Sequence, residues 1–166
     1  MLQIIHVRTE ADAEAVRLLV GEYIGWIYQR YPDQSDLLDT YFRVQDMEGQ
    51  MRDLLTRFVP PAADCLLARL GGVPVGIVMT KRQSEATCEM NRMYVQEAAR
   101  GHGVGRALVA ELLATAKALG YQRMMLPAGL RHTEALALYR SFGFAEAEGI
   151  ADTGAGDAEV RLIRDL

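Results

Sequence analysis

Arg100-Gly101-His102-Gly103-Val104-Gly105 places three glycines at alternate positions of this 166-residue chain, between a strand-like run and an amphipathic helical run. Glycine tolerates positive φ and lets the backbone approach a ligand closely, so such a loop can turn several N–H groups toward one point. The N-terminus of the helix that follows adds the positive end of its dipole. The stretch therefore predicts a binding site for phosphate.

The spacing of the glycines excludes two common nucleotide-binding loops. A dinucleotide fingerprint needs G-x-G-x-x-G, but the position of its last glycine is Arg106 here. A P-loop needs Gly-Lys-Ser/Thr at the start of the helix, whereas this helix begins Gly105-Arg106-Ala107. The pattern that remains is R-x-x-G-x-G over Arg100–Gly105.

This pattern resembles the coenzyme A pyrophosphate loop of the GCN5-related N-acetyltransferases, the GNAT family. Upstream, Cys88–Val95 is similar to the fourth strand of that family, and downstream Ala135–Phe144 is similar to its A-x-x-L-Y-x-x-x-G-F signature. The two blocks lie about one βα unit apart. The resemblance is close over residues 72–148 and covers the rest in outline. It implies a GNAT-like mixed, mostly antiparallel twisted sheet of about seven strands in a single domain over residues 1–166.

The periodicity along the chain predicts a mixed α/β order with helices on both faces of the sheet. A double glycine, Gly71-Gly72, indicates a hairpin, and Gly120 and Gly143 indicate helix ends. Ser35 is the expected cap of a second helical region. Strands are expected at 3–8, 65–70, 73–81, 85–95, 122–127, 144–149 and 159–163, and helices at 9–29, 35–42, 51–58, 104–119 and 133–142.

Composition narrows the classes of partner. The net charge of −4 and the pI near 5.4 argue against nucleic acid and suit an amine-bearing substrate. We expect no membrane span and a cytoplasmic location, because neither the N-terminus nor any later stretch carries a long apolar run. Cys65 and Cys88 form no CxxC pair, so small buried side chains are expected rather than a disulfide or a metal site. A homodimer and a monomer both stay open.

The resemblance implies acetyl-CoA as the acyl donor and assigns residues to it. Backbone N–H groups of the loop would hold the pyrophosphate, and the pantetheine arm would pair with the fourth strand, where an N–H near Met93 polarises the thioester. The family usually has an asparagine three residues before the alanine of its signature; His132 stands there and can still make one hydrogen bond. The expected coenzyme-binding residues are Met93, Tyr94, Val95, Arg100, Gly101, His102, Gly103, Val104, Gly105, Arg106, His132 and Tyr139.

Two residues are candidates for moving protons. Tyr139 matches the tyrosine that the family uses to protonate the leaving thiolate, although an aromatic residue there can also simply pack against the sheet. Glu89 is the candidate base, because strand alternation puts Glu89, Asn91 and Met93 on one face. The alternative for Glu89 is an ion pair with Arg92 or with the substrate ammonium.

The acceptor site is the least defined part of the prediction. Four aromatic residues, Tyr23, Trp26, Tyr28 and Tyr31, gather at the end of the first helix, and Asp152 and Asp157 could meet a cation. We predict an acetyl-CoA-dependent N-acetyltransferase acting on a primary amine of a small molecule, amino acid or peptide by direct attack in a ternary complex. A longer acyl donor is one alternative, and a non-catalytic acyl-CoA-binding sensor or partner-binding module is another.

Overall fold

The computed structural model describes residues 1–147 and 159–166, which form one seven-stranded sheet in the order β1-β2-β3-β4-β5-β7-β6. Neighbouring strands are antiparallel except β4 and β5, which are parallel. The mixed, mostly antiparallel sheet is therefore confirmed. The strands are β1 Leu2–His6, β2 Asp64–Leu70, β3 Val73–Arg82, β4 Thr87–Val95, β5 Arg123–Gly129, β6 Ala145–Glu146 and β7 Glu159–Asp165.

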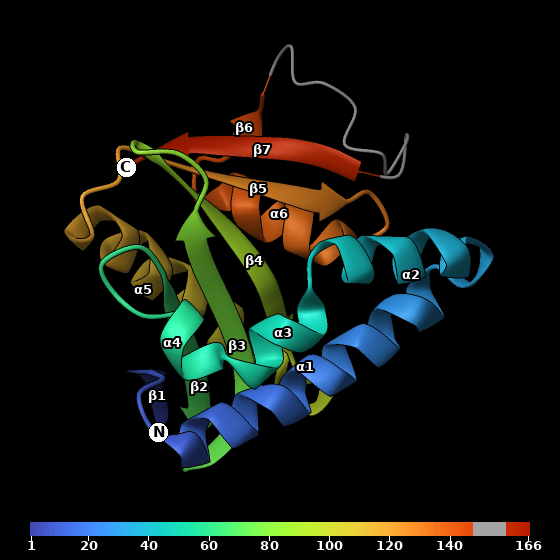
Figure 1. Ribbon diagram of the computed structural model, residues 1–166, viewed down its shortest axis with the longest axis horizontal. Coiled ribbons are helices and arrows are strands. Elements are labelled where there is room, and N and C mark those ends of the chain that lie inside the picture. The colour runs from blue at the N-terminus through green and yellow to red at the C-terminus, as the bar shows by residue number, and fades with distance from the viewer. Residues whose placement is uncertain (148–158) are drawn as a thin grey trace.

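Helices cover both faces of the sheet, with α1 to α4 on one side and α5 and α6 on the other (Figure 1). The Thr9 hydroxyl caps α1 by accepting the N–H of Asp12 at 3.2 Å, as its position before an acidic first turn predicts. The helices are α1 Glu10–Arg30, α2 Ser35–Val44, α3 Met47–Arg52, α4 Leu54–Arg57, α5 Val104–Ala118 and α6 Thr133–Ser141, with short 3₁₀ turns at η1 Pro32–Gln34 and η2 Glu97–Ala99.

Two local predictions on the helical side are wrong. Ser35 is not a cap, because the 3₁₀ turn that starts at Pro32 runs directly into α2 and leaves Gln34 at the cap position. The helix expected over 51–58 is two short helices, since the chain leaves helical geometry at Asp53. The hairpin prediction is confirmed: Gly71 and Gly72 have φ of +58° and +85°, as a two-residue turn between twisted strands requires.

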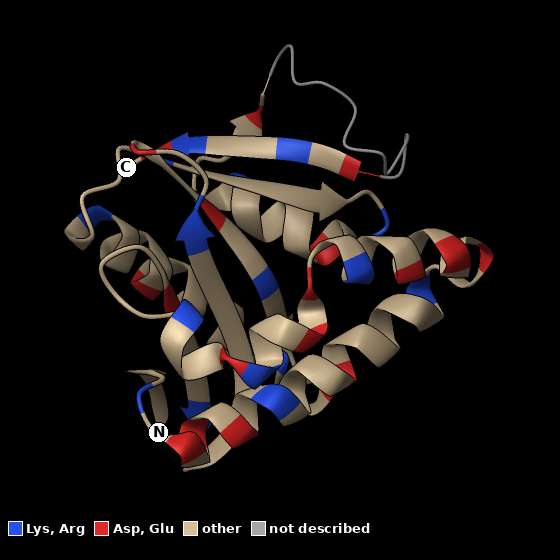
Figure 2. Ribbon diagram, in the orientation of Figure 1, with Lys and Arg blue, Asp and Glu red and all other residues tan. Residues whose placement is uncertain are grey.

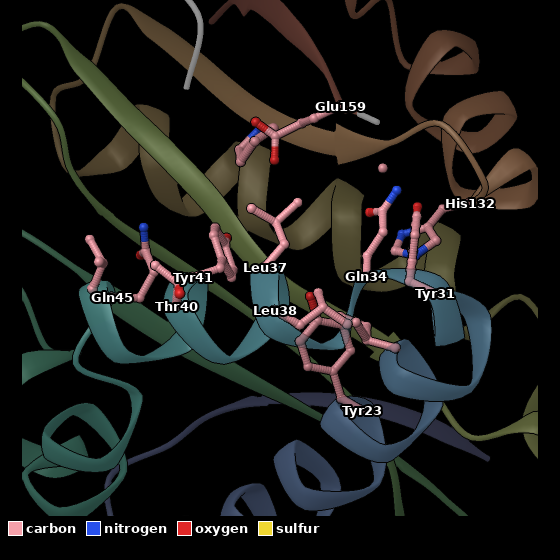
Figure 3. A pocket seen from close by; sticks show the side chains of 14 residues that line it. Tyr23, Tyr31, Gln34, Leu37, Leu38, Thr40, Tyr41, Gln45, His132 and Glu159 are labelled. Carbon is pink, nitrogen blue, oxygen red and sulfur yellow. The ribbon is translucent and has the colours of Figure 1, made fainter. Parts of the chain in front are cut away.

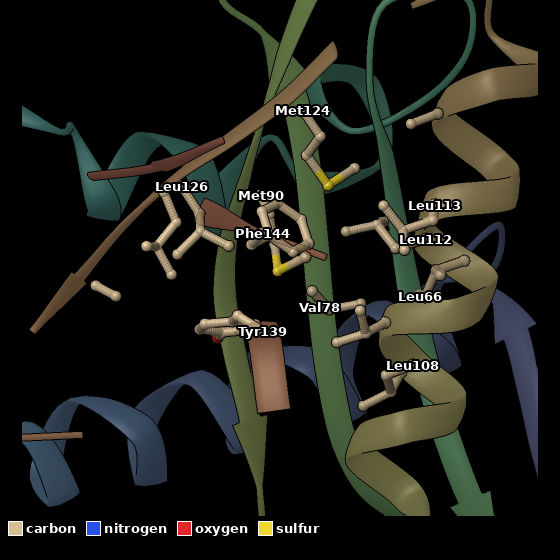
Figure 4. Packing of buried hydrophobic residues seen from close by; sticks show 14 of the residues in the cluster. Leu66, Val78, Met90, Leu108, Leu112, Leu113, Met124, Leu126, Tyr139 and Phe144 are labelled. Atoms are coloured by element: carbon tan, nitrogen blue, oxygen red, sulfur yellow. The ribbon is translucent and has the colours of Figure 1, made fainter. Parts of the chain in front are cut away.

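The two faces of the sheet carry two separate apolar clusters. On one face Leu66, Val78 and Met90 pack against Leu108 and Leu112 of α5 (Figure 4). On the other face, residues of α1 to α4 pack against strand residues such as Cys65 of β2 and Ile77 and Met79 of β3. Cys65 and Cys88 are both free and fully buried, which confirms their role as small apolar side chains.

β4 and β5 pair only at their beginnings, from Thr87 opposite Arg123 to Glu89 opposite Met125. Beyond this point β4 continues to Val95 and β5 to Gly129, and the two strands separate (Figure 1). At Arg92, which has a φ of +53°, the register between β3 and β4 also shifts. The two strands therefore diverge at the end of β4, close to the glycine loop that follows it.

Some predictions fall beyond these elements. The strand expected over 144–149 is described only as β6, and Asp152 and Asp157 lie outside the described residues. Within the described residues no helix is long and apolar enough to cross a membrane, and no cluster of three His, Cys, Asp or Glu side chains could hold a metal ion. Both α1 and α2 begin with acidic residues and carry arginine nearer their ends (Figure 2).

Candidate active site

A cavity of about 610 Å³ opens where the glycine loop meets the end of β4 and the start of α6. Its lining includes most of the residues that the sequence assigns to the coenzyme, and it adds Trp26 from α1. The lining residues are Trp26, Met93, Tyr94, Val95, Ala99, Arg100, Gly101, Gly103, Val104, Gly105, Arg106, His132, Glu134, Ala135 and Leu138.

The loop has the geometry of an anion site. Gly101 and Gly103 have φ of +81° and +77°, and Gly103 is the residue immediately before α5. The N–H of Ala107 makes the first backbone hydrogen bond of the helix, to the Gly103 carbonyl at 3.0 Å, so helix geometry leaves the preceding N–H groups unpaired within α5. An added Cβ at Gly103 would meet no atom within 4 Å. The backbone here faces open space, as a bound phosphate requires.

Gly105 serves a different purpose. A Cβ at this position would lie 3.2 Å from Cδ2 of Leu138 and 3.3 Å from Cε of Met93. The glycine therefore lets α5 pack closely against both β4 and α6. This close packing joins the three elements that form the cavity.

The side chains of the loop divide into two groups. Arg100 donates to the Val95 carbonyl at 3.2 Å and lies over the Trp26 ring, while Arg106 lies over the Phe142 ring. Both guanidinium groups border the cavity. His102 does not: its Nδ1 lies 3.1 Å from the Arg100 carbonyl oxygen, within the loop itself. Only its backbone can contribute to the anion site.

The irregularity of β4 at Arg92 overturns the face assignment on which Glu89 was chosen. Met93 packs with the α5 and α6 cluster, whereas Tyr94 belongs to the α1 to α4 cluster. Cys88 and Met90 face α5, so alternation puts Glu89 on the α1 to α4 face, opposite Met93. The prediction that Glu89 and Met93 share a face is wrong, because the positive φ at Arg92 interrupts the alternation.

Glu89 nevertheless lies toward a second cavity. Its carboxylate is 4.0 Å from Nζ of Lys81, which also donates to Oε1 of Gln45 at 3.1 Å. Gln45 and Tyr41 line this second cavity. Burial raises the pKa of Tyr41, the charge of Arg92 lowers it, and the charges of Glu159 and then of Glu89 raise it by smaller amounts.

The second cavity has a volume of about 300 Å³ and lies between the helices α1 and α2 and the paired ends of β5 and β7. Figure 3 shows side chains of α1 and α2 on one side and Glu159 on the other. Its lining residues are Tyr23, Ile27, Tyr31, Gln34, Leu37, Leu38, Thr40, Tyr41, Val44, Gln45, Pro127, Gly129, His132 and Glu159.

The aromatic wall predicted for the acceptor is divided among three places. Tyr23 and Tyr31 line the second cavity, Trp26 lines the first, and Tyr28 lines neither because its hydroxyl donates to Asp39 on the surface. Sequence reasoning missed Tyr41 and the polar side chains of α2. Their amphipathic spacing was readable, but nothing in the sequence shows that α2 closes a cavity.

His132 is the residue that both cavities share. Its ring lies 4.8 Å from that of Trp26 and 5.3 Å from that of Tyr31, between centroids. Burial, assisted by the charge of Arg30, lowers the pKa of His132 from 6.5 to about 4, so the ring is neutral near pH 7. Its buried Nε2 has no hydrogen-bond partner within the described residues. A neutral ring with one unused nitrogen can bind a polar group at the junction of the cavities.

Two ion pairs hold the turn that carries His132 against the end of α1. Arg131 donates to both oxygens of Asp33, at 2.6 and 2.9 Å, and Arg30 contacts Glu134 at 3.0 Å. The Arg131 guanidinium lowers the pKa of Asp33 to about 2. Gly129 permits this approach, because a Cβ there would overlap the Tyr31 hydroxyl.

Tyr139 is buried among apolar residues and lies edge-on to Phe144, at 6.1 Å between ring centroids (Figure 4). It lines neither cavity, although its neighbour Leu138 lines the first. Burial raises the pKa of the Tyr139 phenol, and Tyr23 adds to this effect. The phenol therefore stays protonated, and its role as proton donor stays a prediction.

The sequence and the fold agree with one known family. Residues 31–144 match the profile of the Acetyltransferase (GNAT) family. An N-acetyltransferase of Schizosaccharomyces pombe is 30% identical over 89% of this chain and 85% of its own length. The chain belongs to the GNAT acetyltransferase family. An IAA acetyltransferase of Azospirillum brasilense is 31% identical to this GNAT chain over 80% of it and 78% of that protein.

The solved structures show the same fold. The PaiA N-acetyltransferase of Thermoplasma acidophilum, determined in complex with coenzyme A, superimposes with a TM-score of 0.75. The match covers 100% of this chain and 99% of that one, at 14% identity. By family this GNAT protein is an N-acetyltransferase.

Proposed function

We propose that this protein transfers the acetyl group of acetyl-CoA to the primary amine of a small molecule, an amino acid or a peptide, by direct attack in a ternary complex. The observation that carries the proposal is that His132 lines both cavities. A donor in the larger cavity and an acceptor in the smaller one would bring their reacting groups together there. Such placement replaces a bimolecular encounter by a reaction between positioned groups.

The donor would use the backbone more than the side chains. The N–H groups at the start of α5 would bind the pyrophosphate, with Arg100 and Arg106 at the border of the cavity. The end of β4, from Met93 to Val95, has no β5 partner and offers backbone groups to the pantetheine amides. An N–H near Met93 would stabilise the negative charge that develops on the thioester oxygen.

The reaction needs two proton transfers. The neutral amine attacks the thioester carbon, the carbon–sulfur bond breaks, and the thiolate takes up a proton. We assign the proton of the leaving thiolate to Tyr139 and the removal of the amine proton to Glu89 through water. Glu89 lies on the face of β4 that α1 to α4 cover, and its partner Lys81 donates to Gln45, which lines the second cavity, here proposed as the acceptor cavity. This link supports the second assignment.

Direct attack is favoured over an acetyl-enzyme intermediate. The chain has two cysteines, and both are fully buried and border neither cavity. Burial also raises the pKa of both thiols, which makes them poor nucleophiles.

Initial rates of thiol release, measured while acetyl-CoA and an amine are varied together, test the proposal. Intersecting double-reciprocal lines are expected for a ternary complex. Parallel lines together with a mass increase of one acetyl group on the enzyme would contradict direct attack. Binding of acetyl-CoA without transfer to any amine of a broad panel would instead favour an acyl-CoA sensor.

A further inference from the structure

Arg92 is a buried cation without an anionic partner in the described part of the chain. Arg92 is 3% exposed, and its Nη2 donates a hydrogen bond to Oε1 of Gln50 at 3.2 Å. No carboxylate oxygen of the described residues lies within 4.0 Å of it, and its Nε has no partner there. Burying an unpaired charge is costly, so proteins rarely keep one without a function.

The neighbouring residue, Asn91, is also buried and has polar atoms that are unpaired among the described residues. Asn91 is 7% exposed, and neither its Nδ2 nor its Oδ1 finds a hydrogen-bond partner in the described residues. Asn91 stands opposite Met79, which faces α1, so its side chain lies on the same face of the sheet as Gln50 and Arg92. Two adjacent residues thus present unused donors and an unused acceptor in one place.

This polar pair lies beside the acceptor cavity. Neither Asn91 nor Arg92 lines the cavity itself, but Gln50, which accepts a hydrogen bond from Arg92, donates from Nε2 to the backbone oxygen of Gln45 at 2.7 Å. Gln45 lines the cavity, so the guanidinium is one hydrogen-bonded residue away from its wall. The backbone at Arg92 has positive φ, a strained conformation for arginine. It is also the residue just before Met93, whose backbone we assign to the thioester oxygen. An anion bound by Arg92 would therefore lie close to the attacking amine.

We propose that the acceptor carries a carboxylate next to its amine, as an α-amino acid does, and that Arg92 binds this carboxylate with the help of Asn91. The inference rests on the proposed N-acetylation and narrows its substrate class. Guanidinium and carboxylate pair through two parallel hydrogen bonds, which also fixes the orientation of the amine.

The rest of the cavity defines the remaining part of the acceptor. Leu37, Leu38 and Val44 give it apolar walls, and the tyrosines add aromatic surface. Its volume of about 300 Å³ is at the small end for ligand sites. These properties favour a small α-amino acid with an apolar side chain.

Matched pairs of acceptors test the proposal through thiol release: L-leucine against 3-methylbutylamine, and L-phenylalanine against 2-phenylethylamine. The members of each pair differ only by the carboxylate. In the wild type we expect kcat/KM at least about 30-fold higher for the amino acids. Arg92→Met should abolish this preference while the affinity for acetyl-CoA, measured by calorimetry, stays within about threefold. Equal or better rates with the plain amines would overturn the carboxylate site and leave the proposed N-acetylation intact.

The control and a second readout separate a binding role from a structural one. Arg69→Met removes a partly buried cation that pairs with Asp12 far from both cavities, so it should lower the melting temperature and keep the substrate preference. Arg92→Met should melt at or above the wild-type temperature, because it removes an unpaired buried charge. A clear fall in its melting temperature, with equal losses for acids and amines, would overturn the proposal.

If the protein acetylates none of these acceptors, the carboxylate site can still be tested by measuring the binding of an N-acetylated product. N-acetyl-L-leucine should bind the wild type in the presence of coenzyme A and lose at least about 30-fold in affinity in Arg92→Met. Arg92→Lys, which retains the charge and loses the planar fork, should fall between the two. Binding that does not change in either variant would exclude Arg92 as the carboxylate site, whatever the outcome for transfer.

Discussion

Replacing His132 by asparagine should flatten the acid side of the stability profile. In the unfolded chain this histidine gains a proton below about pH 6.5, but in the folded chain only below about pH 4. Between these values the unfolded state holds more protons than the folded state. The wild type therefore loses unfolding free energy as the pH falls from about 6.5 to about 4, and this histidine causes no loss above about pH 6.5. With each pKa unit equal to about 1.4 kcal/mol, the full difference sets an upper limit of about 3 kcal/mol. Because part of the ring still contacts solvent, we expect about 1 to 2 kcal/mol.

Urea denaturation of both proteins at pH 7.5 and at pH 4.5 measures this difference. The loss of unfolding free energy between the two pH values should be smaller by about 1 to 2 kcal/mol in His132→Asn than in the wild type. His102→Asn is the control, because it also removes one histidine but its ring is exposed on the loop. If His132→Asn and His102→Asn lose equal stability on acidification, the argument that burial keeps His132 neutral is refuted.

Three further variants test the site. Gly103→Val should weaken acetyl-CoA binding in calorimetry by at least about tenfold, because it forces a side chain into the anion site at positive φ. Gly120→Val is the control: this glycine also has positive φ but lies at the far end of α5, so the variant should be less stable and bind acetyl-CoA normally. Tyr139→Phe should retain coenzyme affinity and lower kcat about 10- to 100-fold; an unchanged kcat would leave Tyr139 a packing residue. Glu89→Gln should lower kcat most at low pH, and kcat should partly recover as rising pH increases the share of free amine. If the pH–rate profiles of this variant and the wild type are superimposable, Glu89 takes no part in the reaction.

Local sequence signals predicted the elements that depend on local geometry. The double glycine before Val73 allows only a tight hairpin turn, and Gly120 and Gly143 end α5 and α6 at positive φ, as expected. The glycine loop was predicted for the same reason, because its backbone angles are a property of the loop itself. Ser35 failed because its capping role depended on where the preceding turn ends, which Pro32 moved.

The composition of the acceptor cavity could not be predicted in the same way. Tyr41 and Gln45 line it because α2 lies across from β5 and β7, a tertiary relation that helical periodicity does not contain. Likewise His132 was predicted as a coenzyme-binding residue, and nothing in the sequence showed that it also lines the second cavity. The close packing of its turn on α1, through Gly129 and Tyr31, puts it there.

The misassigned face of Glu89 follows from one residue and explains the site as a whole. A regular β4 would put Glu89 and Met93 on the same face of the sheet. The positive φ at Arg92 instead turns Met93 to the face covered by α5 and α6 and leaves Asn91 and Glu89 on the face covered by α1 to α4. Strain, an unpaired buried guanidinium and the separation of two strands coincide within a few residues. Each of these features costs stability, and a bound donor and acceptor would make use of all three, so their coincidence supports the proposal that the two substrates meet at this point of β4.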